Sequence, residues 1–268
     1  MEGIRMIIDF HVHTFPAAIA QRALKELSND DRYTSHTEGT IESTREKMIE
    51  WGIDKFVILN IATKPSQHTS INNLCAKHNS EDIISFGSVF PAAESTDELR
   101  RIKSLGLKGI KFHNDYQRVY ADDKCVFPIY ELAQALDLIV VFHAGFDPFS
   151  PDAHHCTPKM LARINDLYPN LKIVGAHLGG LLMWDDVEEY LVGRRNVYFD
   201  TAFIKGYIEP EQATRIIKAH EKNILFGSDC PWDSSANQAD FIRSLNLTTE
   251  EKEDVFYKNA LRLLQIED

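Results

Sequence analysis

The sequence predicts an α/β fold: a single (β/α)8 barrel, or TIM barrel, that takes up residues 1–268 as one domain. Apolar runs of strand length alternate with helical patterns along the chain, which is typical of parallel strands covered on both faces. The length of 268 residues agrees, because such barrels commonly need about 250 residues. The end of the first strand and the turn after it read DFHVHTFP, which contains no glycine, and this disfavours an open doubly wound sheet with a GxGxxG turn.

The elements follow in a regular order. The expected strands cover residues 7–13, 54–62, 83–91, 107–113, 138–145, 171–180, 196–203 and 223–232. The expected helices cover residues 17–27, 41–52, 70–79, 97–106, 127–137, 157–169, 186–195, 210–221, 237–246 and 249–268. Residues 14–50 therefore form an elaborated first strand–helix loop, which could sit over the barrel mouth.

Composition narrows the classes of function. The net charge is −11, with 29 basic and 40 acidic residues, whereas a nucleic-acid-binding protein needs a basic surface. The four cysteines are scattered without a CxxC pair, which argues against a disulfide scaffold or a cysteine-ligated zinc module. We see no signal peptide and no apolar run near the ~18 residues of a membrane span. These observations predict a cytoplasmic protein that binds neither nucleic acid nor membrane.

Polar side chains recur where the expected strands end. In a parallel barrel these carboxyl ends meet at one face, which carries the chemistry. His11 and His13 share one side of the first strand because residues i and i+2 point the same way. The full set at the strand ends is His11, His13, Lys111, His113, His143, His177 and Asp229. Closure of the barrel would gather these residues, although they are spread over the sequence.

This set predicts an open catalytic metal site. Neutral imidazoles and a carboxylate suit zinc and similar divalent ions, and water takes the remaining position. The ion lowers the pKa of that water and polarises a substrate carbonyl. Asp229 would bind the ion, take up the proton of the water and return it to the leaving group.

The motifs DFHVH, VFHAG, GAHLGG and LFGSDCPW, in this order, resemble those of the amidohydrolase superfamily, in its amidohydrolase-2 branch. The similarity runs over about residues 7–264. The resemblance implies a mononuclear site with His11, His13, His143 and Asp229 as ligands, usually of zinc and in some members of manganese. His177 would lie just outside the ligand shell and assist proton transfer. Dimers are common in this branch, although no stretch of the sequence marks a homodimer interface.

The role of Lys111 has two interpretations. Some superfamily members carry a carboxylated lysine on the fourth strand, where it bridges two metals and makes the strand-six histidine a ligand. We favour an ammonium group that contacts a substrate carboxylate. His113 and Arg118 are further candidates for substrate binding, and a structural hydrogen bond is an equal explanation for His113.

Other side chains are expected to be structural. We expect Cys230, beside Asp229, to pack rather than to act as a nucleophile. We expect His36, His68, His78 and His220 to lie at the surface.

The predicted function is that of a metal-dependent hydrolase that uses a metal-activated water on a small amide, ester or lactone. The alternative is a metal-dependent non-oxidative decarboxylase of a small carboxylic acid. Decarboxylases of this branch usually carry longer loops and more pocket arginines, whereas this chain is compact, and this favours hydrolysis. A phosphoesterase of the trinuclear type is disfavoured because SDCPW stands where Asp-x-His is expected. A non-catalytic barrel is disfavoured by the intact ligand set.

Overall fold

The computed structural model describes residues 4–27, 34–151 and 153–267. The chain divides into two compact units. The first comprises residues 1–58, 81–83 and 201–268, and the second comprises residues 59–80 and 84–200. The borders fall within two strands, β2 (Lys55–Leu59) and β3 (Ile83–Phe86). Whether the whole chain is one domain stays a prediction.

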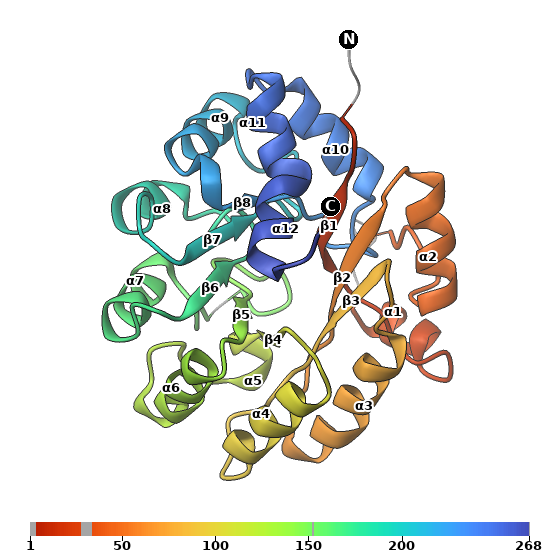
Figure 1. Cartoon of the computed structure of the whole chain (residues 1–268), viewed down its shortest axis with the longest axis vertical. Coiled ribbons are helices and arrows are strands. Elements are labelled where there is room, and N and C mark those ends of the chain that lie inside the picture. The colour runs from red at the N-terminus through yellow and green to blue at the C-terminus, as the bar shows by residue number, and fades with distance from the viewer. Residues whose placement is uncertain (1–3, 28–33, 152, 268) are drawn as a thin grey trace. The chain divides into compact units, whose positions relative to one another are not determined.

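Eight strands alternate with helices in the described part of the chain, as the sequence predicts (Figure 1). The first unit contains β1 (Ile8–Val12), α1 (Ala20–Leu27), α2 (Ile41–Glu50), α9 (Pro210–Ala219), β8 (Ile224–Leu225), α10 (Ser235–Ser244), α11 (Thr249–Glu253) and α12 (Asn259–Leu264). The second unit contains α3 (His68–His78), α4 (Ser95–Ser104), β4 (Gly109–Phe112), α5 (Asn114–Gln117), α6 (Phe127–Ala135), β5 (Ile139–Phe142), α7 (Pro158–Leu167), β6 (Lys172–Gly175), α8 (Trp184–Tyr190) and β7 (Val197–Asp200).

In the first unit, β1 lies between two parallel partners. Ile8 pairs with Lys55 of β2 on one side, and the register shifts between Asp9 and Val12. On the other side, the Phe10 amide donates to the Phe226 carbonyl at 2.7 Å, and Val12 forms a parallel bridge with Cys230. The segment after β8 therefore continues alongside β1, and this brings the two ends of the chain together.

The second unit holds a continuous parallel ladder. Figure 1 shows β4, β5, β6 and β7 in sequential order, and their residues pair in an even register from Gly109–Ile139 onward. Gly87, just after β3, adds a bridge to Ile110. Phe112 and Phe142 stack with ring centroids 5.8 Å apart, and Tyr130 of α6 packs edge-on against both. The faces of this ladder are buried, as the apolar runs in the sequence predict.

Side-chain hydrogen bonds cap the first turns of several helices. Thr40, Thr157 and Ser234 each accept a backbone N–H in the first turn of α2, α7 and α10, and Thr248 forms a capping box with Glu251 in α11. The helix predicted over 249–268 is interrupted by a π-helical turn, Asp254–Lys258. No helix among the described residues combines the length and the apolar character that crossing a membrane requires.

Two histidines that we expected at the surface are buried. His68 is 5% exposed, and its Nε2 accepts the Phe90 backbone N–H at 2.6 Å. His220, also 5% exposed, ends α9. The prediction was wrong for these two residues because helical periodicity does not reveal which polar side chain meets another segment. Cys230 is fully buried, as predicted.

Gly145 fixes the turn that follows β5. Its φ of +87° is in the region that glycine favours, and a β-carbon there would lie 2.2 Å from the Leu181 amide nitrogen. The close approach is part of the ladder, because Gly145 bridges to Leu181 and the Phe146 amide donates to the Leu181 carbonyl. The glycine therefore sets the path of the loop that begins with His143.

We predict that Gly145→Ala lowers the free energy of unfolding by about 3 kcal/mol or more, because strain in φ and a backbone clash add. Gly193→Ala is the matched control: its φ is +82° and nothing lies within 4 Å of the added β-carbon. We expect a loss of only about 1 kcal/mol there, from the backbone strain alone. Urea unfolding measures both values, and equal losses in the two variants would contradict the clash.

Candidate metal centre and neighbouring site residues

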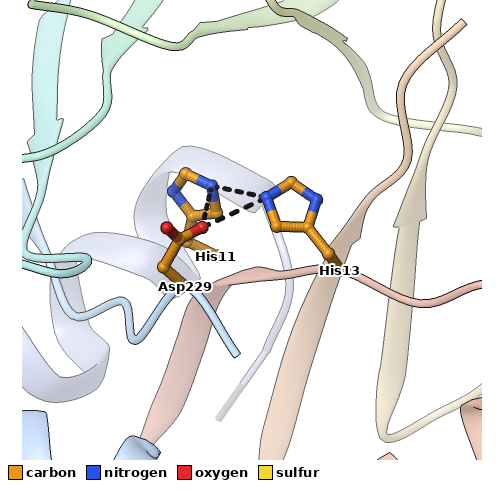
Figure 2. A group of neighbouring side chains, drawn as sticks. All are labelled: His11, His13 and Asp229. Carbon is orange, nitrogen blue, oxygen red and sulfur yellow. Dashed lines mark hydrogen bonds and ion pairs between the residues drawn. The ribbon is translucent and has the colours of Figure 1, made fainter. Parts of the chain in front are cut away.

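Three predicted metal ligands meet in the first unit. Figure 2 shows His11 and His13, at the end of β1, facing Asp229 from the segment after β8. The two Nε2 atoms are 3.1 Å apart, and each lies 3.2 Å from Oδ1 of Asp229. His11 is 1% exposed, whereas the side chains of His13 and Asp229 are 12% and 13% exposed. The same-side placement predicted for the two histidines is present in the structure.

These three donor atoms fit a divalent metal ion. They form a nearly equilateral triangle with edges of 3.1–3.2 Å, the spacing of adjacent ligands about one ion with metal–ligand distances of about 2.1 Å. Two imidazole nitrogens and one carboxylate oxygen are ligands that zinc, manganese and iron accept. His11, His13 and Asp229 could therefore hold a metal together, with one side of the ion left for other ligands.

A buried carboxylate, Asp9, holds the two segments of this group in place. Its Oδ1 accepts the backbone N–H of His11 at 3.1 Å and that of Ser228 at 3.0 Å. Its Oδ2 accepts the Ser235 hydroxyl at 2.6 Å. Asp9 therefore fixes His11 itself and Ser228, the neighbour of Asp229. The Asp229 amide completes the link by donating to the His11 carbonyl at 2.9 Å.

Burial raises the pKa of Asp9 to about 6, and the hydrogen bonds from Ser228, Ser235 and His11 oppose the rise. Desolvation dominates because the side chain is fully buried without a positive partner among its hydrogen-bonding groups. A carboxyl with a raised folded-state pKa stabilises the fold most at low pH, and this contribution falls as the pH rises through about 6.

The second unit gathers a separate set of imidazoles. The ring of His113, after β4, lies between Tyr116 and His143, with centroid distances of 3.6 Å and 4.1 Å and nearly parallel planes. His177, after β6, meets His143 edge-on, and its Nε2 is 3.1 Å from Nδ1 of His143. The strand ends of β4, β5 and β6 thus bring three predicted site residues into contact, two of them stacked and the third edge-on.

Hydrogen bonds define the proton positions on His143. Its Nε2 lies 3.3 Å from the Phe146 carbonyl oxygen, which can only accept, so Nε2 carries the proton. Nδ1 then accepts from Nε2 of His177. If His143 binds a metal as the sequence predicts, one of these two hydrogen bonds must give way.

A second group, His113, His143 and Asp147, has donor atoms within 4.8 Å of one another. Its ring geometry does not suit a shared ion. The planes of His113 and His143 are only 9° apart and the rings are stacked face to face. Because the nitrogen lone pairs lie in the ring planes, they run parallel rather than converging. We interpret the stack as an aromatic wall.

Lys111 and Arg118 have opposite environments. The Lys111 side chain on β4 is 1% exposed, and it belongs among the largest fully buried side chains. Arg118 ends α5 with a φ of +54° and is exposed. Burial raises the pKa of the neighbouring Cys156 thiol, and the positive charge of Lys111 opposes the rise.

The backbone at His177 is strained and held by its surroundings. His177 and Leu178 have φ values of +59° and +56°, a conformation that costs non-glycine residues roughly 1–2 kcal/mol. Asp200 at the end of β7 accepts both N–H groups, with its Oδ1 and its carbonyl oxygen. The Trp184 indole donates to the His177 carbonyl at 3.1 Å. Strain of this kind persists only where several contacts enforce it.

The sequence analysis did not identify two buried carboxylates, Asp9 and Asp115, as important residues. In the sequence, Asp9 looks like an ordinary strand residue and Asp115 like an ordinary residue near a strand end. Only the structure shows the hydrogen bonds of Asp9 with Ser228 and of Asp115 with His155. Both act through partners far away in the sequence, so no local pattern marked them. The DFH spacing is the one signal that could have directed attention to Asp9.

The fold and the cluster of His11, His13 and Asp229 together define a (β/α)8 barrel protein of the kind that binds a divalent ion at the ends of its strands. The amidohydrolase family model, of the amidohydrolase-2 type, matches residues 8–266, so the chain belongs to the amidohydrolase family. This confirms the resemblance seen in the DFHVH, VFHAG, GAHLGG and LFGSDCPW motifs. A search of the curated proteins gave no match.

Solved structures confirm the barrel fold. The chain is similar to 5-carboxyvanillate decarboxylase from Sphingomonas paucimobilis, with a TM-score of 0.74, 19% identity and coverage of 98% and 99% of the two chains. It is similar to an uncharacterised TIM-barrel protein from Bordetella bronchiseptica, with a TM-score of 0.80, 20% identity and coverage of 97% and 98%. It is also similar to a manganese-bound dihydroxybenzoic acid decarboxylase from Polaromonas sp., with a TM-score of 0.71, 17% identity and 97% coverage of both chains.

We predict that Asp9→Ala weakens metal binding at least tenfold and lowers the free energy of unfolding by about 3 kcal/mol, because three donors lose their acceptor. Asp9→Asn should retain most of both, since its amide oxygen can still accept the two backbone N–H groups. Ser235→Ala is the matched control, because it removes only the hydroxyl donor. Zinc titration and urea unfolding measure the effects. Normal zinc affinity in Asp9→Ala would contradict the positioning role of Asp9.

Proposed function

We propose that this protein is a metal-dependent, non-oxidative decarboxylase of a small aromatic carboxylic acid. The observation that carries the proposal is the triangle of donor atoms from His11, His13 and Asp229, in a chain of the amidohydrolase family. Support for the reaction type comes from similar solved structures, which include decarboxylases of 5-carboxyvanillate and of 2,6-dihydroxybenzoate. This is the alternative reading of the sequence, and the comparisons support it better than hydrolysis.

His11, His13 and Asp229 would hold the ion, and His143 is the fourth ligand that the resemblance implies. A divalent ion bound there would hold oxygen atoms of the substrate and withdraw electron density from it. Zinc is the ion expected from the sequence, and two similar decarboxylase structures contain manganese. A second metal with a carboxylated Lys111 is the less favoured arrangement.

The protein's own residues would supply the remaining steps. Decarboxylation breaks the bond between the ring carbon and the carboxylate, releases carbon dioxide and leaves an electron pair that takes up a proton. Asp229 and His177 are the proposed proton carriers. Lys111, His113 and Arg118 are the proposed substrate contacts. The buried Lys111 ammonium would pair with the acid, and the stacked ring of His113 would form part of the wall.

We predict about one divalent metal ion per chain in protein purified without added metal or chelator. His11→Ala and Asp229→Asn should each lose it, because each removes one of three converging donors. His143→Ala tests the proposed fourth ligand in the same series, and Lys205→Ala, far from any proposed ligand in the sequence, is the control. Inductively coupled plasma mass spectrometry gives the stoichiometry. Two ions per chain would instead favour the carboxylated Lys111, and none after reconstitution would exclude the metal-dependent reaction.

We predict that the protein loaded with zinc or manganese releases carbon dioxide from at least one hydroxybenzoic acid. The activity should disappear with a chelator and return with metal, and Asp229→Asn should lower kcat at least 100-fold, because it loses a ligand and a proton carrier together. A coupled carbon dioxide assay provides the measurement. Amides, esters and lactones belong in the same panel, since hydrolysis of these without any decarboxylation would restore the hydrolase assignment.

A further inference from the structure

A strained aromatic residue lies in the first unit, in the segment ahead of α9. Phe203 has a φ of +56°, and this backbone conformation is costly for a bulky side chain. Its neighbours Ala202 and Ile204 are fully buried, whereas Phe203 itself is partly exposed. The backbone is therefore strained at the one residue of the three that keeps a large apolar side chain near solvent, and strain of this kind is concentrated at functional sites.

The ring of Phe203 is paired with a second exposed ring. The ring centroids of Phe203 and Tyr207 are 5.4 Å apart, and the ring planes are tilted by 32°. Tyr207 is 39% exposed. The separation lies in the range that aromatic rings prefer, and a third ring can pack against such a pair in an offset or edge-on arrangement. The two side chains therefore form an aromatic surface of the first unit.

A single turn of the backbone holds the two rings in place. The amides of Tyr207 and Ile208 both donate to the Ile204 carbonyl, at 3.1 Å and 3.2 Å. Ile204 and Ile208 are buried and are four residues apart, so they lie on one side of the turn. Phe203 and Tyr207 have the same spacing and share the exposed side. Because the isoleucines anchor the turn, the rings are oriented before a ligand binds, which lowers the entropy cost of binding.

Hydrogen bonds place this segment beside the segment that carries Asp229. The Thr201 amide donates to the Leu225 carbonyl at 3.0 Å, and the Gly227 amide donates to the Thr201 hydroxyl at 3.1 Å. This is the pattern of parallel strands, with the hydroxyl in place of a backbone carbonyl. Phe203 and Asp229 each follow this pairing by two residues, so they leave the same end of the two paired segments. The aromatic surface and the metal-ligand carboxylate therefore lie at one edge of the first unit.

We propose that Phe203, supported by Tyr207, determines specificity by packing against the aromatic ring of an acid bound at the candidate metal centre. The inference rests on the proposed function for its substrate class, and it names the surface that recognises the ring. The ion would hold the substrate oxygen atoms, which aromatic and aliphatic acids have in common. The aromatic surface would distinguish the two classes, because a flat ring packs closely against it and a puckered saturated ring does not.

The alternative is that the two rings only complete the packing of the turn. Phe203→Leu and Phe203→Tyr separate these explanations, because both variants keep a large side chain at the same backbone position but only tyrosine keeps the ring. Tyr207→Leu and Tyr207→Phe form a second matched pair at an exposed position, where the fold should tolerate both changes. Thermal unfolding of each variant shows whether the turn remains folded, and the second pair keeps the test decisive if Phe203→Leu unfolds.

The measurement is calorimetric binding of benzoate and of cyclohexanecarboxylate to the zinc-loaded protein. The two probes carry the same charge and differ in the aromaticity of the ring. We expect the wild type, Phe203→Tyr and Tyr207→Phe to bind benzoate about fivefold more tightly than cyclohexanecarboxylate. Phe203→Leu should abolish this preference, and Tyr207→Leu should reduce it about twofold. A wild type without the preference, or a folded Phe203→Leu or Tyr207→Leu variant that keeps all of it, would overturn the inference.

Failure of the proposed function is visible separately, because the binding measurement needs no turnover. Loss of the ring preference in Phe203→Leu, in a protein that decarboxylates none of the hydroxybenzoic acids, would support the aromatic surface and reject the reaction. In an active enzyme, Phe203→Leu should raise KM about fivefold and change kcat little, as expected for lost substrate binding, while the affinity for zinc stays that of the wild type. Decarboxylation with an unchanged KM in Phe203→Leu would reject the aromatic surface and leave the reaction standing.

Discussion

The candidate metal centre depends on one buried carboxylate. Asp9 and Ser228 are 219 positions apart in the sequence, and hydrogen bonds between β1 and the segment after β8 bring them side by side. A strand pairing alone permits a slip of register, which would turn side chains to the other face. Asp9 opposes such a slip because its Oδ1 accepts N–H groups from both segments at once. The placement of Asp229 opposite His11 follows from this constraint.

Hydrogen bonds from a neighbouring segment also fix two residues that follow strands in a strained backbone conformation. Asp229 has a φ of +69° and His177 a φ of +59°, and each is enforced by hydrogen bonds from a neighbouring segment. The His11 carbonyl accepts the Asp229 amide, and Asp200 accepts the amides of His177 and Leu178. Both residues lie just beyond a strand end, where the backbone must turn so that a side chain can face the site.

Local patterns in the sequence predicted most of the strands and helices, and they predicted that His11 and His13 face the same way. Apolar runs located the strands, and the spacing of two explained why His11 and His13 share a side. Nothing local predicted that Asp9 would bind Ser228, that Asp115 would bind His155, or that His68 and His220 would be buried. These contacts join residues from different segments, and their geometry appears only after packing. The expected strand 223–232 is also shorter in the structure, where β8 covers only Ile224–Leu225.

The ligand set alone does not decide between hydrolysis and decarboxylation, because a divalent ion that polarises a substrate serves both. What differs is the substrate that the surrounding side chains accept. A carbonyl substrate for hydrolysis needs no positive group beyond the ion, whereas a carboxylate substrate does. Strand β4 carries the buried Lys111, and the exposed Arg118 lies in the segment that follows it. In the proposed decarboxylation, Lys111 and Arg118 would supply that positive charge to the substrate carboxylate.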